Sequence, residues 1–202
     1  MTIRKGSDYG EARPLPHGAP IVRSDAELHE IVAEAVLEQR LPVTVGLLGG
    51  DLCRTLGGTG RRDRLDGPDA RSVPVDLVLA AIDDVTVPVV AHLIAGRLFG
   101  APFAAVMNAQ WIGELDLGPR SHPGDGLVDI TTGTLPVRQR LLARRRARSG
   151  THLPHPGLQY RRVNADTMTF DHSTRVRIDG ARTLRGRSIS ITVVPDAFTV
   201  VV

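Results

Sequence analysis

The chain has 202 residues, of which 42% are hydrophobic and only 3% aromatic, so its core must be built from aliphatic side chains. The formal net charge is +3, and Lys5 is the only lysine among many arginines, a balance that permits an anionic partner without requiring one. A single cysteine excludes an internal disulfide framework and a multi-cysteine zinc site, and no apolar run is long enough to span a bilayer. These features predict a cytoplasmic protein, with peripheral attachment to a membrane surface left open.

The first part of the chain predicts an extended arm followed by a helix. Residues 1–20 are rich in glycine and proline and show little periodicity. Ser24 and Glu27 have the spacing of a capping box, so a helix is expected to begin there and to end near Arg40, before Pro42.

A short apolar run, residues 43–48, predicts a buried strand, and it is followed by the glycine-rich stretch LGGDLCRTLGGTG. Asp51 is expected to cap a short helix that the later glycines end. Gly49, Gly50 and Asp51 could form a phosphate cradle at that helix N-terminus. The other interpretation, a tight strand-to-helix turn, is favoured because Asp51 places an anion where a phosphate would lie. Residues 59–71 are charged and rich in turn formers, which predicts a surface loop.

From residue 72 onwards, β-branched and small apolar runs alternate with turn signals. Asp179-Gly180, directly after the segment RVRI, predicts a hairpin turn. One helix is expected to interrupt the strands, from Pro136 to the glycine at position 150. We therefore predict an α+β protein, mainly an antiparallel β-sandwich: an arm over residues 1–20, a small α/β piece over 21–70 and the β domain over 71–202.

The interrupting helix is strongly basic and carries a thin apolar stripe that includes Leu141 and Leu142. Such a helix suits an anionic lipid surface, but it could also be a solvated helix that pairs with acidic loops. Nucleic-acid binding is disfavoured because almost no aromatic residues lie among the basic ones. The arginines that would contact an anionic surface are Arg138, Arg140, Arg144, Arg145 and Arg148.

Several motifs resemble the C-terminal half of the diacylglycerol kinase and bacterial lipid kinase family. The segment MNAQWIGELDLGPRSHPGDGLVDI places Asn108, Gly113, Pro119, Asp125 and Gly126 in the order of a family segment, and RIDGA and ITVVPDAFTVVV are similar to its late hairpin and closing strand. VGLLGGDLCRTLGG resembles the family segment that follows the nucleotide loop GGDGT. That loop is not found upstream of Val43, where only the arm and one helix are expected, so the nucleotide domain is expected to be largely missing.

The resemblance also bears on catalysis. The family carries Asp-Gly-Glu where this chain has Asp179-Gly180-Ala181, and the glutamate is the candidate general base. An alanine methyl cannot accept a proton, so Asp179 is retained and the base position, Ala181, is not. In the family a structural Mg²⁺ is held near the step that corresponds to Asp125. That resemblance alone suggests Mg²⁺, and no other cofactor is expected.

The leading interpretation is a family homologue that is catalytically incompetent alone and acts as a lipid- or partner-binding module. Its ligand groove would contain Asn108, Asp125 and Asp179. Two alternatives stay open. In one, the chain is the acceptor half of a lipid kinase, completed by a nucleotide-binding partner chain or by a homodimer; in the other, it binds nucleic acid through its basic surface.

Overall fold

A computed structural model describes residues 10–100 and 102–202. The first nine residues of the expected arm lie outside this range. The rest of the arm contains a two-residue strand, β1 (Glu11–Ala12), which pairs with the start of β4 (Arg71–Ile82).

The chain then forms a compact α/β unit. It consists of β2 (Ile21–Val22), α1 (Asp25–Leu37), β3 (Thr44–Leu47) and α2 (Asp51–Thr55). β2 and β3 are parallel, and β3 is also parallel to the end of β13 (Arg182–Val201). The expectation that only an arm and one helix precede Val43 is therefore wrong, because a strand lies between them.

The capping residues of α1 act largely as predicted. Ser24 Oγ accepts the Glu27 N–H at 3.2 Å, and Glu27 reaches back to the Arg23 N–H, one residue before the cap. A second difference lies at residues 59–71, where the expected loop contains a short helix, α3 (Arg62–Asp66).

The remaining strands form one large sheet that is mainly antiparallel. It contains β5 (Val85–Val89), β6 (His92–Gly96), β7 (Phe103–Met107), β10 (Val128–Gly133), β11 (Leu158–Val163) and β12 (Ala165–Ile178), together with β1 to β4 and β13. The strand order along its main path is β1-β4-β13-β12-β6-β7-β10-β11, which confirms the predicted α+β class with antiparallel strands dominant. A separate hairpin joins β8 (Trp111–Ile112) and β9 (Leu115–Asp116).

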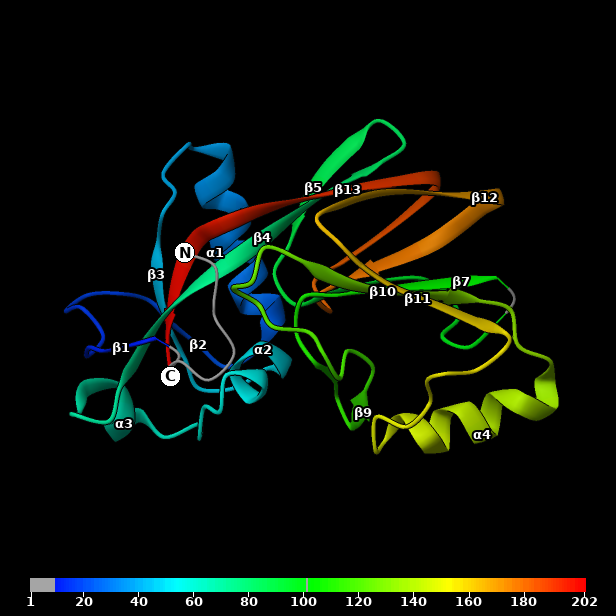
Figure 1. The fold of residues 1–202 in the computed structure, drawn as a ribbon. Coiled ribbons are helices and arrows are strands. Elements are labelled where there is room, and N and C mark those ends of the chain that lie inside the picture. Colours follow the sequence, from blue (N-terminus) through cyan, green and yellow to red (C-terminus); the bar gives the residue numbers. More distant parts are fainter. Residues whose placement is uncertain (1–9, 101) are drawn as a thin grey trace.

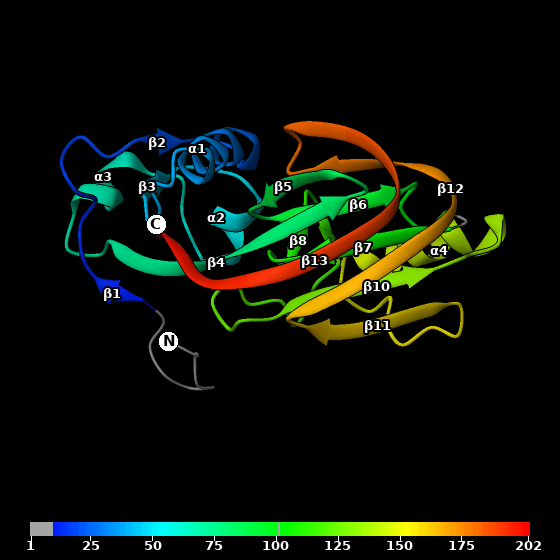
Figure 2. The ribbon, with the colours of Figure 1, turned by 90° about the horizontal axis from the view of Figure 1, so that it is seen from above.

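The sheet curls so that its two halves enclose a core (Figures 1 and 2). Aliphatic residues of β4, β12 and β13 pack with those of β7 and β10 in one buried cluster, which includes Val78, Ile189, Val106 and Ile130. The scarcity of aromatic residues is met by β-branched side chains, which fit the pleated surface.

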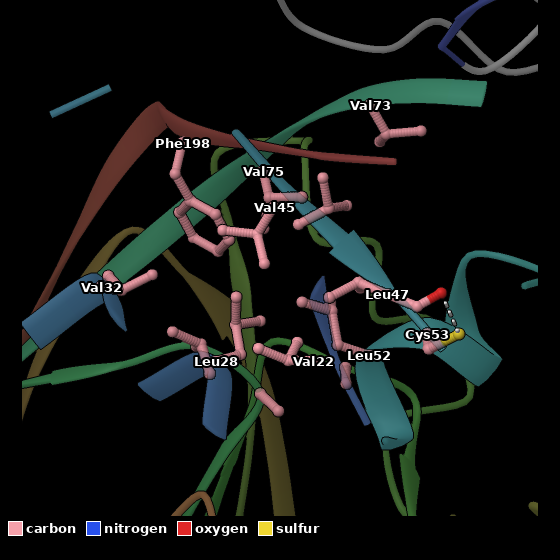
Figure 3. Packing of buried hydrophobic residues seen from close by; sticks show 14 of the residues in the cluster. Val22, Leu28, Val32, Val45, Leu47, Leu52, Cys53, Val73, Val75 and Phe198 are labelled. Atoms are coloured by element: carbon pink, nitrogen blue, oxygen red, sulfur yellow. Dashed lines mark hydrogen bonds between the residues drawn. The ribbon is translucent and has the colours of Figure 1, made fainter. Parts of the chain in front are cut away.

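A second core joins the α/β unit to the sheet (Figure 3). Leu28 of α1, Leu47 of β3 and Leu52 of α2 pack with Val75 and Phe198 of the long strands β4 and β13. Because β13 runs from one core into the other, the α/β unit and the curled sheet share a continuous strand (Figure 1).

The arginine helix is α4 (Val137–Ala147), preceded by Pro136 as expected. Only Ala143 and Ala147 of this helix are buried, against a third core cluster that includes Phe99 and Phe103. No helix in the described residues is long and apolar enough to cross a membrane.

Just beyond α4, His152 is 2% exposed and its ring packs edge-on against Phe99. Neither ring nitrogen has a hydrogen-bond partner among the described residues. Burial lowers the pKa of His152 to about 4 from an ordinary value of 6.5.

This histidine predicts an acid-sensitive fold. The unfolded chain binds a proton at His152 below pH 6.5, whereas the folded chain binds it only below about pH 4. The free energy of unfolding should therefore decrease by about 1 kcal/mol for each unit that the pH is lowered from 6.5 to 4. We expect His152→Leu to weaken this dependence and to raise the unfolding free energy at neutral pH, because it removes unpaired buried nitrogens. Urea unfolding of the wild type and of His152→Leu from pH 7 to pH 4.5 measures this pH dependence. Parallel pH profiles of the two proteins would contradict the role given to His152.

Candidate functional site

One buried carboxylate, that of Asp179, joins three distant parts of the chain. It lies in the predicted turn between β12 and β13 and is 2% exposed. Its oxygens accept the backbone N–H groups of Val90, Ala91 and His92 at 2.8–2.9 Å. His29 Nδ1 lies 3.0 Å away and, since a carboxylate only accepts, carries the proton. Asp179 thereby fixes the corner between β5 and β6 and one face of α1.

The residue after this turn cannot take part in proton transfer. Ala181 begins the return towards β13, and its N–H donates to Ile178 O at 2.9 Å. The carboxylate oxygens of Asp179 accept hydrogen bonds from backbone groups and from His29. The turn therefore has a structural role, because its one carboxylate holds β5, β6 and α1 together.

A second carboxylate fills the N-terminus of α2. Asp25, from the first turn of α1, accepts the N–H of Asp51 at 2.6 Å and of Leu52 at 3.1 Å. Desolvation by burial raises the pKa of Asp25 to about 6, although both backbone hydrogen bonds oppose the shift. Asp25, and not Asp51 as expected, therefore caps this helix.

The two glycines before α2 fit this arrangement. A Cβ at Gly49 would lie 2.3 Å from Arg23 O, and one at Gly50 would lie 2.5 Å from Asp25 Oδ1. Gly50 also has φ +96°, which favours glycine. The glycines thus allow the turn between β2 and α1 to approach α2 closely, which supports the interpretation of this stretch as a tight turn.

The side chain of Asp51 pairs with His92. Its carboxylate lies 3.2 Å from His92 Nε2 and accepts the Gly113 N–H at 2.9 Å. Burial opposes ionisation, but the hydrogen bonds from His92 and Gly113 hold the pKa of Asp51 below its ordinary value. Burial likewise disfavours a charged His92, yet Asp51 and the charges of Asp179 and Asp25 raise the pKa of that histidine.

Asp25, Asp51 and His92 form the one group in the described part of the chain that could hold a metal ion. One ligand atom from each lies within 4.8 Å of the others. Two carboxylates and one imidazole suit a divalent cation chemically. In this structure the same atoms are engaged in capping α2 and in the pair between Asp51 and His92.

The hairpin of β8 and β9 covers Asp51. The Arg54 guanidinium lies 3.5 Å from the centre of the Trp111 ring and donates to Gly113 O at 2.7 Å. The N–H of Gly113 also donates to Asp51. Both backbone polar groups of Gly113 therefore hold the hairpin against side chains of α2.

Asn108 and Asp125, expected in a ligand groove with Asp179, belong to a buried hydrogen-bond network. Asn108 Nδ2 donates to Asp76 O and to Val90 O, both at 2.9 Å, and Val90 in turn bonds Asp179. Asp76 accepts the Gly126 N–H at 2.6 Å. The structure thus joins Asn108 and Asp179 through Val90, whereas Asp125 is linked to this network only through the backbone of its neighbour Gly126. Asn108 Oδ1 is buried without a hydrogen-bond partner among the described residues.

Asp125 does not fit a magnesium site in this arrangement. Its carboxylate is paired with the Arg162 guanidinium and accepts the Leu127 N–H at 3.0 Å. Arg162 also lies 2.9 Å from Asp129. A cationic side chain already neutralises the carboxylates that would ligate the ion.

The arginine helix α4 lies on the outer surface. Val137, Leu141 and Leu142 are 73%, 78% and 48% exposed, so the expected apolar stripe faces away from the core. Arg140 differs from the other predicted contact residues because its Nε donates to Leu135 O, at the base of the helix. The exposed basic residues are Arg138, Arg144, Arg145, Arg146 and Arg148.

Sequence reasoning missed Asp25, His29 and His92. No local motif marks them, since the partners of Asp25 lie 26 and 27 residues away and those of Asp179 lie 87 to 150 residues away. Asp25 and His29 are four residues apart on α1 and so share one face, a spacing that could have suggested a common polar environment.

Comparison with known proteins identifies the architecture. Three solved structures assigned as diacylglycerol kinases of Bacillus anthracis str. Sterne match 89% of this chain, with TM-scores of 0.68, 0.63 and 0.66. The chain has a diacylglycerol-kinase fold. Sequence identity to them is 16%, 15% and 14%, and the matches cover 76%, 74% and 76% of those chains. No family model and no curated protein matches the chain.

The extent of these matches shows that the α/β unit belongs to the shared fold. Residues 21–70 make up 50 of 202 residues, about a quarter of the chain, whereas only 11% of the chain lies outside the match. Most of the unit is therefore matched together with the sheet. The structural match therefore extends beyond residues 43–202, the range over which the sequence motifs show a resemblance.

The hydrogen bonds of the Asp179 carboxylate predict a large loss of stability when its charge is removed. Asp179→Asn puts an amide group against backbone N–H donors and should lower the unfolding free energy by about 2–4 kcal/mol. Denaturant unfolding measures the loss, with Asp171→Asn, on the exposed part of β12, as the control. A loss below about 0.5 kcal/mol would contradict the role given to Asp179.

The capped α2 helix predicts that nucleotide phosphates do not bind there. ATP or ADP with Mg²⁺, titrated into the protein in a calorimeter, should give no saturable heat, because the Asp25 carboxylate occupies the helix N-terminus. Saturable binding that slows hydrogen exchange over residues 49–51 would refute this account of the glycine stretch.

Proposed function

We propose that this chain is a noncatalytic protein with a diacylglycerol-kinase fold that attaches to anionic lipid surfaces through α4. The observation that carries the proposal is the outer face of α4, where exposed arginines flank exposed Leu141 and Val137. A helix of this kind lies in the plane of a membrane, with its apolar side chains in the acyl boundary and its cations at the headgroups.

The charge around α4 is strongly one-sided. No aspartate or glutamate occurs from residue 130 to residue 165, a stretch that contains eight arginines, of which Arg161 and Arg162 pair with carboxylates outside it. Within the described residues, the only ion pair of an α4 arginine joins Arg148 to Glu114 at 3.4 Å, with both side chains mostly exposed. Pairing with acidic loops therefore leaves most of this charge uncompensated, which favours an anionic partner.

Part of this charge also stabilises the helix itself. Arg144, Arg145 and Arg146 lie in the last turn of α4, where cations interact favourably with the helix dipole. This effect accounts for cations at the C-terminus, but it accounts neither for Arg138 in the first turn nor for the exposed leucines.

Three observations support the absence of phosphoryl transfer by the chain alone. The position of the candidate base is Ala181, and Asp25 fills the N-terminus of α2. The segment RSDAE, residues 23–27, forms the link between β2 and α1 and the start of α1, and it contains no glycine, unlike the loop GGDGT. Phosphoryl transfer requires held phosphates and an activated hydroxyl, and these segments are not built to supply either.

Vesicle flotation tests the proposed attachment. The wild-type protein should float with vesicles that contain about 30 mol% phosphatidylglycerol and not with pure phosphatidylcholine. The pair Arg138→Glu and Arg145→Glu should weaken binding at least about tenfold, because each arginine at the surface contributes about 1 kcal/mol. Leu141→Ser should weaken it by a smaller factor without changing the charge.

A matched control reverses two exposed arginines of the sheet, Arg175→Glu and Arg182→Glu, and should bind as the wild type does. Equal binding by the α4 and sheet variants would refute a specific role of α4. Steeply salt-dependent binding to DNA without binding to vesicles would favour nucleic acid instead.

A further inference from the structure

A pocket of about 900 Å³ lies beside the end of α4. It is formed by two segments, the turn that contains Pro119 and Arg120 and the stretch from Gly150 to Tyr160. Gly150 is three residues beyond the last residue of α4, and a Cβ there would lie 3.5 Å from Pro119. The volume is within the usual range for small-molecule sites.

The wall of this pocket is mainly apolar. Leu153 and Leu158 line it together with Pro119, Pro154 and Pro156. Leu158 is 8% exposed and belongs to the same buried cluster as Ala143 and Ala147 of α4. The wall is therefore continuous with the core that supports the arginine helix.

Three polar side chains line the pocket, those of Arg120, His155 and Tyr160, and the first two can bind an anion. Arg120 is exposed and has no ion pair among the described residues. His155 Nδ1 accepts the Gly157 N–H at 3.0 Å, so in the neutral ring the proton is on Nε2, which remains a donor. The Arg120 guanidinium and the Nε2–H of His155 favour an anionic ligand.

We propose that this pocket binds one anionic glycerophospholipid, with part of an acyl chain against the leucine and proline wall and the phosphate at Arg120 and His155 Nε2. A free phosphate would leave the apolar wall exposed to water, whereas a lipid covers it. The inference rests on the proposed function, because attachment of α4 would bring the pocket to the headgroups. The pocket shares no residue with the cluster of Asp25, Asp51 and His92.

A short-chain lipid below its micelle concentration separates this site from the surface of α4. Native mass spectrometry and calorimetry with dihexanoyl phosphatidylglycerol should show one bound lipid. Arg120→Glu should weaken binding at least about tenfold, as expected for the loss of a charge-assisted hydrogen bond. Dihexanoyl phosphatidylcholine should bind more weakly, and inorganic phosphate should not bind saturably.

The pair Arg138→Glu and Arg145→Glu is the matched control. It should bind the short-chain lipid as the wild type does while it fails to float with vesicles. Wild-type protein that binds no short-chain lipid, or Arg120→Glu that binds it undiminished, would overturn the pocket assignment and leave vesicle attachment standing. Failure of the wild-type protein to float with anionic vesicles would instead overturn the proposed function.

Saturable binding of inorganic phosphate at Arg120 that matches the lipid in affinity would also overturn the assignment, since the acyl chain would then contribute nothing. Leu153→Ser supplies a second check, because Leu153 is only half-buried and its replacement should weaken lipid binding without preventing folding.

Discussion

The buried carboxylate of Asp179 is the constraint on which the rest of the site depends. An ionised group in an apolar interior is costly unless every acceptor is used, and here four donors surround it: three successive backbone N–H groups from Val90 to His92, and His29. These donors come from the β5–β6 corner and from α1. One side chain in the β12–β13 turn therefore fixes the α/β unit against the curled sheet, and it also places the His92 ring beside Asp51.

The polar groups around the α2 N-terminus and Asp125 are bonded to groups of the same chain. Asp25 occupies the donors at the start of α2, Asp51 occupies His92 and Gly113, and Arg162 neutralises Asp125. Each contact removes a group that could otherwise meet a phosphate or a metal ion. The uncompensated charge lies elsewhere, on α4, where arginines and leucines face outwards and, within the described residues, Arg148–Glu114 is the only ion pair of these arginines. The proposed attachment rests on this surface.

Local sequence signals predicted the elements that depend on local physics. The Ser24 cap, the Asp179-Gly180 turn and the arginine helix after Pro136 were all expected from short motifs, and the antiparallel α+β class followed from the alternating strands. β2 was missed because two residues carry no periodicity, and α3 because its charged sequence also suits a loop. The cluster of Asp25, Asp51 and His92 is held by contacts between residues 26 to 41 apart, which no single-sequence pattern encodes.

Hydrogen–deuterium exchange of the wild-type protein tests the central claim most directly, because one experiment reports on α4 and on α2 together. With anionic vesicles, the account predicts slower exchange over residues 137–150, and with Mg²⁺ and ATP it predicts no change over residues 49–57. Protection of residues 49–57 by ATP, with residues 137–150 unaffected by vesicles, would contradict it.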